Sequence, residues 1–155
     1  MTSKPEDLEV LFTYFNEINI IAQLSNNMFE QQLPEGLTSS QFSVLNWFVR
    51  VDDEATPGRL AKAFQVTGGA MTNTLKKLES KKLVSIRPDE NSGRRKIVTM
   101  TSKGRVTRES AIAAIGPLLS QFEEAFSAGQ LKRPLKHLKD VRAYLDEYRF
   151  GPERS

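Results

Sequence analysis

One predicted helix carries four polar side chains, Thr72, Asn73, Lys76 and Lys77, with the spacing of a single exposed face. An asparagine amide donates and accepts hydrogen bonds at once, as the edge of adenine requires, and a threonine hydroxyl can do either. A lysine ammonium binds phosphate or guanine. This combination suits a partner with both phosphates and base edges, which is a nucleic acid.

A second group of candidate binding residues, Ser92, Gly93, Arg94, Arg95 and Lys96, lies about twenty residues further along the chain. It follows a stretch rich in turn formers, so we expect it at the tip of a β-hairpin with Arg94 foremost. The tip of a hairpin is exposed, so its charge faces either water or a partner. A narrow DNA minor groove attracts arginine, and we expect Arg94 to reach one.

The charge of the chain is unevenly distributed. Residues 59–108 contain 13 Lys and Arg against 3 Asp and Glu, a net charge of +10, whereas the remainder holds 9 basic and 16 acidic residues, a net of −7. Such asymmetry indicates that one section meets a polyanion. A basic face that is merely solvated would give the same composition.

Helices dominate the elements that must position these residues. Apolar residues three and four apart predict a helix over 6–32. Thr38 and Gln41 form a capping-box pattern that opens a helix to about Val51, followed by a loop at 52–54. Thr56 before Pro57 begins a short helix, and Thr67 caps the next one, which runs to about Ser80.

Two short helices joined by a tight turn make a helix-turn-helix, and the chain then changes to the alternation of strands. Residues 84–87 and 96–100 predict a hairpin with its turn at 88–93. Thr101 can cap a long helix, and Ser127 with Gln130 can cap the last one. A helix-turn-helix followed by a hairpin is a winged helix, whose second helix enters the DNA major groove with its first residues, here Thr67, Gly68 and Gly69, nearest the bases.

The predicted fold is therefore mainly α with a small β-hairpin in a single chain of 1–155. A winged-helix lobe at 37–101 binds DNA, and long helices at 6–32 and 102–149 flank it. The helices at 6–32 and 128–149 carry more apolar residues than a small lobe needs. We expect them to form a homodimer, which would place two recognition helices about 34 Å apart.

Three stretches, LTSSQFSVLNWF, TPGRLAKAFQVTGGAMTNTLKKLESKKLVSIRPD and SGRRKIVTMTSKGR, resemble the multiple-antibiotic-resistance regulator (MarR) family of transcription factors. They span about Leu37 to Arg105. The resemblance implies a homodimer, built from the first and last helices, that binds a palindromic double-stranded DNA operator. It also implies a repressor that is released by a small anionic or aromatic effector.

The chain departs from the family pattern at three places. Lys82 stands where the family usually has glycine, so we expect a positive φ at a non-glycine residue. Ser92 replaces the usual wing aspartate. Gly68 and Gly69 replace a polar start of the recognition helix and leave its N–H groups open to a phosphate.

Phe42, Trp47 and Phe48 are candidates for the lining of an effector pocket, although a place in the core is the favoured interpretation for each of them. No cofactor or metal site is indicated: the chain has no cysteine, and His137 is its only histidine. Catalytic motifs are also missing, so we expect no enzyme.

Neither a signal peptide nor a membrane span is indicated, and a cytoplasmic protein is expected. The alternative function is a winged-helix protein-interaction module without DNA binding. RNA binding is disfavoured because the aromatic stacking platform is missing.

Overall fold

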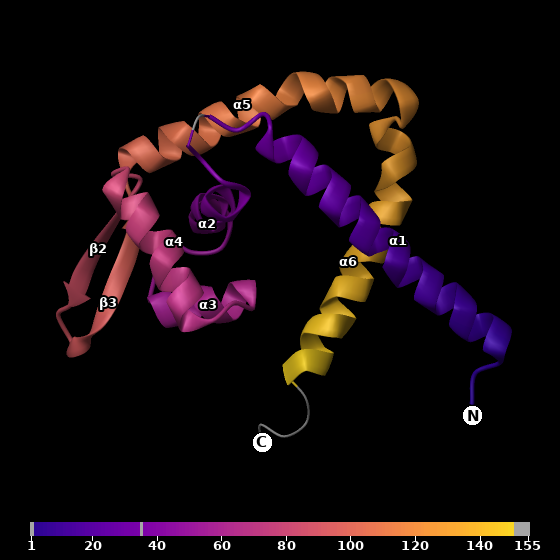
Figure 1. Cartoon of the computed structure of the whole chain (residues 1–155), viewed down its shortest axis with the longest axis horizontal. Coiled ribbons are helices and arrows are strands. Elements are labelled where there is room, and N and C mark those ends of the chain that lie inside the picture. The colour runs from indigo at the N-terminus through magenta and orange to yellow at the C-terminus, as the bar shows by residue number, and fades with distance from the viewer. Residues whose placement is uncertain (1, 35, 151–155) are drawn as a thin grey trace. The chain divides into compact units, whose positions relative to one another are not determined.

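The computed structural model describes residues 2–34 and 36–150 and confirms a mainly helical fold with a small antiparallel sheet (Figure 1). The helices are α1 (Pro5–Glu30), α2 (Ser39–Arg50), α3 (Pro57–Phe64), α4 (Gly68–Ser80), α5 (Ser102–Ala125) and α6 (Ala128–Phe150). The strands are β1 (Glu54–Ala55), β2 (Val84–Asp89) and β3 (Ser92–Met100).

Hydroxyl caps set the starts of the helices as the sequence predicts. Thr38 Oγ1 accepts from the Gln41 backbone N at 3.2 Å, and Gln41 Oε1 accepts in return from the Thr38 backbone N at 3.5 Å. Single caps of the same kind begin α3 at Thr56, α4 at Thr67 and α5 at Thr101. Each cap satisfies one N–H group that the first helical turn leaves unpaired.

The sheet has the order β1-β3-β2. In β1, Glu54 lies opposite Thr99 and Ala55 opposite Val98, so the predicted loop at 52–54 is wrong for Glu54. A strand of two residues has no periodicity of its own. It exists because a partner strand far along the chain offers hydrogen bonds to it.

The wing differs from its predicted form, because the turn comprises only Glu90 and Asn91 instead of residues 88–93. The register between β2 and β3 shifts next to the turn, because Asp89 lies opposite Ser92 but Pro88 lies opposite Lys96. The three residues between these partners on β3, Gly93, Arg94 and Arg95, have no partner on β2 and form a bulge. The prediction that Arg94 is foremost at the tip is therefore wrong.

The core lies within the winged-helix lobe, where α2, α3 and α4 pack together and the β2–β3 hairpin lies beside α4 (Figure 1). Its largest fully buried side chains are Leu45, Leu60, Leu75, Leu78, Val44 and Val98. Met71, Leu75 and Leu78 form the buried side of α4, as predicted.

Side chains from two other segments hold the C-terminal end of α4. Lys81 Nζ donates to the Gly36 carbonyl and, at 2.6 Å, to Oε1 of the buried Gln41. Thr101 Oγ1 donates to the Lys82 carbonyl at 2.7 Å. Lys82 has φ +60°, which confirms the expected left-handed residue, and Gln65 adopts a second one, at φ +53°, that was not expected.

The chain divides into two compact units, Met1–Ile115 and Gly116–Ser155, with the boundary inside α5 at Gly116–Pro117. Proline has no N–H and removes a hydrogen bond from the helix at this point. In the first unit, α1 has no buried residue along its 26 positions. In the second unit, no side chain in the described range 116–148 is buried. Among the described residues, no helix has the length and apolarity needed to span a bilayer.

Candidate nucleic-acid interface

The first turn of α4 exposes its backbone. Thr67 Oγ1 accepts from the Ala70 backbone N at 3.1 Å, while the N–H groups of Gly68 and Gly69 have no acceptor within the helix. A Cβ added at either glycine would meet no atom within 4 Å. Packing inside the chain therefore does not require these glycines, and their effect is to let an outside group approach the helix start.

The outward face of α4 carries the predicted contact residues. Thr72, Asn73, Lys76 and Lys77 are all exposed, on the side of the helix opposite the buried leucines. Their side chains have no hydrogen-bond or salt-bridge partner among residues 2–34 and 36–150. A face with amide, hydroxyl and ammonium groups that are not engaged in the fold is available to a partner molecule.

A basic recess lies between the first turn of α3 and the bulge of β3. It has a volume of about 460 Å³ and is lined by Thr56, Gly58, Arg59, Arg94, Arg95 and Lys96. All four of its charged residues are cations. Arg94, Arg95 and Lys96 were assigned to the interface from the sequence, but a contribution of α3 to it was not predicted. The capped helix start at Thr56, with Arg59 three residues later, is the pattern from which this contribution could have been predicted.

Arg59 is fixed in this recess by its neighbours. Its Nη1 lies 2.5 Å from Asp52 Oδ2, and its guanidinium stacks 5.0 Å from the centre of the Trp47 ring. The hydrogen bond from Arg59 lowers the pKa of Asp52 below its ordinary value. On the neighbouring strands, Arg87 pairs with Glu54 at 3.2 Å, which ties β2 to β1.

The candidate effector residues belong to the core region of α2. Phe48 is buried, Phe42 and Trp47 are half-buried and pack against the core, and the Trp47 and Phe48 rings meet edge to face with centres 5.4 Å apart. None of the three lines the basic recess. Their proposed contact with an effector remains a prediction.

Comparisons with known proteins match this geometry. A sequence model of the MarR family matches residues 35–95, which contain the helix-turn-helix and most of the wing. A mutant MarR from E. coli in complex with operator DNA is 26% identical, with a TM-score of 0.73, and the match covers 90% of this chain and 99% of that one. The chain is thus similar to the MarR family in the sequence of its winged-helix segment and in its fold. This similarity confirms the predicted resemblance to the MarR family.

Two further structures share the MarR fold at lower identity. The MepR–DNA complex from S. aureus is 24% identical, with a TM-score of 0.70 and coverage of 85% of this chain and 97% of that one. BpsR from Bordetella bronchiseptica, whose DNA binding is regulated by 6-hydroxynicotinic acid, is 18% identical, with a TM-score of 0.71 and coverage of 84% and 98%. No curated protein sequence matches the chain significantly.

Proposed function

We propose that the chain is a cytoplasmic homodimeric transcription regulator that binds a palindromic operator in double-stranded DNA and represses transcription until a small molecule releases it. The observation that carries the proposal is the exposed polar face of α4, whose side chains make no hydrogen bond or salt bridge within the described residues. The recess lined by four cations supports it. Residues 37–101 act as the DNA-binding lobe in this proposal, and residues 6–32 and 102–149 act in dimerisation.

In the proposed complex, α4 lies in the major groove. Thr72 and Asn73 meet base edges, because an asparagine amide can make two hydrogen bonds to adenine. Gly68 and Gly69 direct free N–H groups to a phosphate at the helix start. Lys76 and Lys77 lie further along the helix and neutralise backbone phosphates.

The basic recess is the proposed second contact, and it fits a phosphate. Arg94 and Arg95 lie in the β3 bulge opposite the first turn of α3 instead of at the end of the wing. Guanidinium groups are phosphate ligands, and at the start of α3 the Gly58 N–H can add one more donor, because Pro57 has no N–H and the Arg59 N–H is bonded to Thr56 Oγ1. We therefore replace the minor-groove role expected for Arg94 with a backbone contact shared by α3 and the wing.

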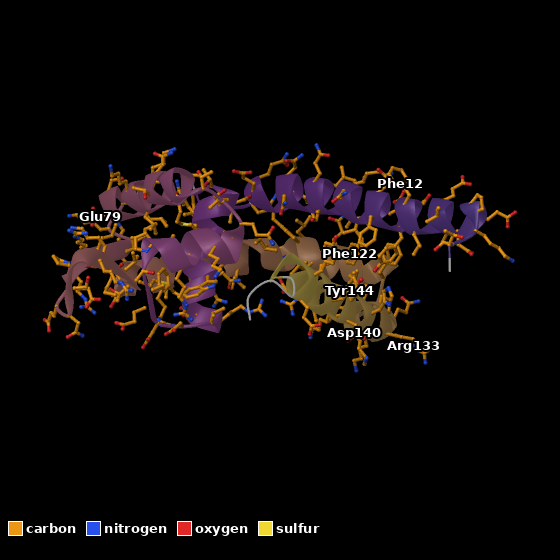
Figure 2. The ribbon with its side chains drawn as sticks, turned by 90° about the horizontal axis from the view of Figure 1, so that it is seen from below. Phe12, Glu79, Phe122, Arg133, Asp140 and Tyr144 are labelled. Atoms are coloured by element: carbon orange, nitrogen blue, oxygen red, sulfur yellow. The ribbon has the colours of Figure 1, made fainter. Side chains whose placement is uncertain are left out.

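Homodimerisation is supported by apolar side chains that each unit leaves exposed. In α1, Phe12 is 73% exposed, and in α6, Tyr144 is 66% exposed; Figure 2 labels both. Exposed apolar residues recur along α1 at Leu8, Val10, Leu11, Phe15, Ile20, Ile21 and Leu24. Soluble monomers rarely expose this many large apolar side chains on one helix, so a second copy is the proposed cover.

The test begins with purified protein and fragmented genomic DNA, from which the retained segments are sequenced and the operator is defined. Binding of that operator is then titrated at several salt concentrations. If a dimer neutralises about six to ten phosphates, its affinity falls by about 10³–10⁵ between 50 and 200 mM salt. Lys77→Ala should lower the slope by about one per subunit. Lys136→Ala is the matched control, because Lys136 is paired with Asp140 on α6 at 2.9 Å.

A flat salt response or no retained DNA would overturn the proposal and favour the protein-interaction alternative. Repression is tested with a reporter gene placed behind the operator. Loss of the protein should raise expression of the reporter, and lowered expression would instead indicate an activator.

A further inference from the structure

A second recess in the first unit, to which no residue of the wing contributes, has a different chemistry. It lies where the end of α1, the start of α2 and one flank of α4 meet, and its volume is about 480 Å³. Ligand pockets in proteins measure about 300–1,000 Å³. We call it the Glu30 groove, after the one charged residue among those that line it.

The lining of the Glu30 groove combines apolar and polar side chains. Val44 and Met71 are buried and Phe64 is half-buried, and these three offer an apolar surface. The polar side chains include the hydroxyl groups of Ser39, Ser40 and Ser43 on α2, and Asn26 and Glu30 on α1. Such a groove fits a small molecule with an apolar body and one polar end.

The negative charge of Glu30 determines which charge is favoured on the polar end of a bound ligand. Glu30 is exposed, and its Oε1 accepts a hydrogen bond from the Ser39 backbone N at 3.3 Å, which places the carboxylate beside the start of α2. Its other oxygen has no hydrogen-bond partner in the part of the chain that the structure describes. No lysine, arginine or histidine lines the groove, so a carboxylate ligand would face Glu30 without a counter-charge. A protonated amine would instead form a charge-assisted hydrogen bond with it.

We infer that the Glu30 groove binds a small apolar molecule that carries a protonated amine, and that it excludes the aromatic acids expected from the family resemblance. The effect of such a ligand on DNA binding rests on the proposed function. Ala70 and Thr74 of α4 form part of the wall of the groove. Thr74 directly follows Asn73, which lies on the outward face of the same helix. A molecule held between α4 and the ends of α1 and α2 therefore changes the affinity for DNA if its own affinity differs between the free and DNA-bound forms.

The experiment compares three probes with one ring system: 1-naphthylmethylamine, which is a cation, 1-naphthylmethanol, which is neutral, and 1-naphthoate, which is an anion. Calorimetric titration of the DNA-free protein should give an affinity for the amine at least tenfold above that for the acid. Glu30→Gln should weaken the amine by about tenfold and change the alcohol by less than twofold, because glutamine keeps the acceptor for Ser39 but loses the charge.

The matched control is Glu17→Gln, which removes the same charge from α1 about 20 Å along the helix from Glu30 and should leave all three affinities unchanged. Ser43→Leu, which fills the groove and keeps the carboxylate, should weaken the amine and the alcohol alike. The inference is overturned if the acid binds as tightly as the amine, or if Glu30→Gln and Glu17→Gln have the same effect.

The regulatory consequence has a separate measurement. The operator is titrated over a range of amine concentrations, and a change in affinity of threefold or more, which Glu30→Gln shifts to about tenfold higher amine, would support a role as effector site. An unchanged DNA affinity would overturn that role. DNA binding without any probe tests the proposed function by itself, so the two failures are distinguishable.

Discussion

Asn73 and Lys77 lie one helical turn apart on the exposed face of α4, but they should meet different parts of a DNA duplex. Asn73→Ala should relax discrimination at one base pair in each half-site by about 1–3 kcal/mol, because a bidentate amide contact to a base is lost. Lys77→Ala should weaken all sequences about equally, because a phosphate contact carries no sequence information. Titration of both variants against operators with single base changes separates these outcomes, and equal losses on every operator would contradict the role of Asn73.

Gly104 is required by packing, in contrast to the glycines of α4. A Cβ at this buried position of α5 would lie 2.1 Å from the Leu83 carbonyl oxygen and 2.9 Å from Met100 Cγ. Gly104→Ala should therefore lower the free energy of unfolding by about 1–3 kcal/mol, since the contact with the backbone cannot be relieved by a rotamer change.

The matched control for this substitution lies in the same helix. Apart from its chain neighbours, a Cβ at Gly116 meets nothing within 4 Å. Gly116→Ala should therefore change the free energy of unfolding by less than about 1 kcal/mol, because the gain in helix propensity is opposed by Pro117, which disfavours a side chain on the helical residue before it. Urea unfolding measures both variants. Equal and small effects would show that α5 can move away from β2 without cost.

Helix starts were predictable because their chemistry is local. Thr38, Thr56, Thr67 and Thr101 each cap a helix through a contact with a residue only three positions later. The outward face of α4 follows from helical period for the same reason. The errors concern pairing between distant segments, since neither β1 nor the bulge of β3 has a local signal. The recess was missed as well, because it exists only once the wing lies beside α3.

Asp52 and Arg59 link the end of α2 to α3, and this link should depend on pH. Arg59 lowers the pKa of Asp52 in the folded state, so the contact stabilises the fold above the ordinary pKa of the group and is lost as pH falls through the lowered value. Wild type should thus be more stable than Asp52→Asn at neutral pH, with a difference that begins to shrink near pH 4 and is lost as pH falls through the lowered pKa of Asp52. Denaturant unfolding across pH measures it.

The control for this link is Asp53→Asn, which removes the same charge one residue away and leaves the contact with Arg59 in place. Its stability relative to wild type should show no comparable pH dependence. If Asp52→Asn and Asp53→Asn behave alike, the effect is one of net charge and not of the pairing between α2 and α3.

The bulge of β3 leads to a distinct prediction for the wing. If Arg94 binds a phosphate together with α3, Arg94→Ala should lose the same affinity on operators with A·T-rich and G·C-rich flanks. A larger loss on A·T-rich flanks would place the guanidinium in the minor groove instead, where narrow A·T tracts attract it. Gly58→Ala is a useful companion, because it adds a methyl group at the recess without altering charge.

The assembled molecule should be a dimer at micromolar concentration, with twice the 17.5 kDa mass of the chain. Phe12→Glu should shift it toward the monomer and weaken operator binding, because a charge would enter an apolar contact and the two lobes would then bind independently. Val51→Glu introduces the same charge at an exposed apolar residue at the end of α2 and should leave the dimer intact. Sedimentation measures both, and a monomeric wild type would contradict the prediction.

The unburied α1 has a consequence for the way this protein is made. The ribosome releases α1 before the winged-helix lobe or α6 has emerged. Its exposed phenylalanines, leucines and isoleucines must then remain in water while the rest of the chain is made. Apolar surface exposed during synthesis is a target for chaperones and a cause of aggregation. The α1 helices of two chains growing on one messenger RNA are near each other throughout this time, which favours pairing of the chains before either is complete.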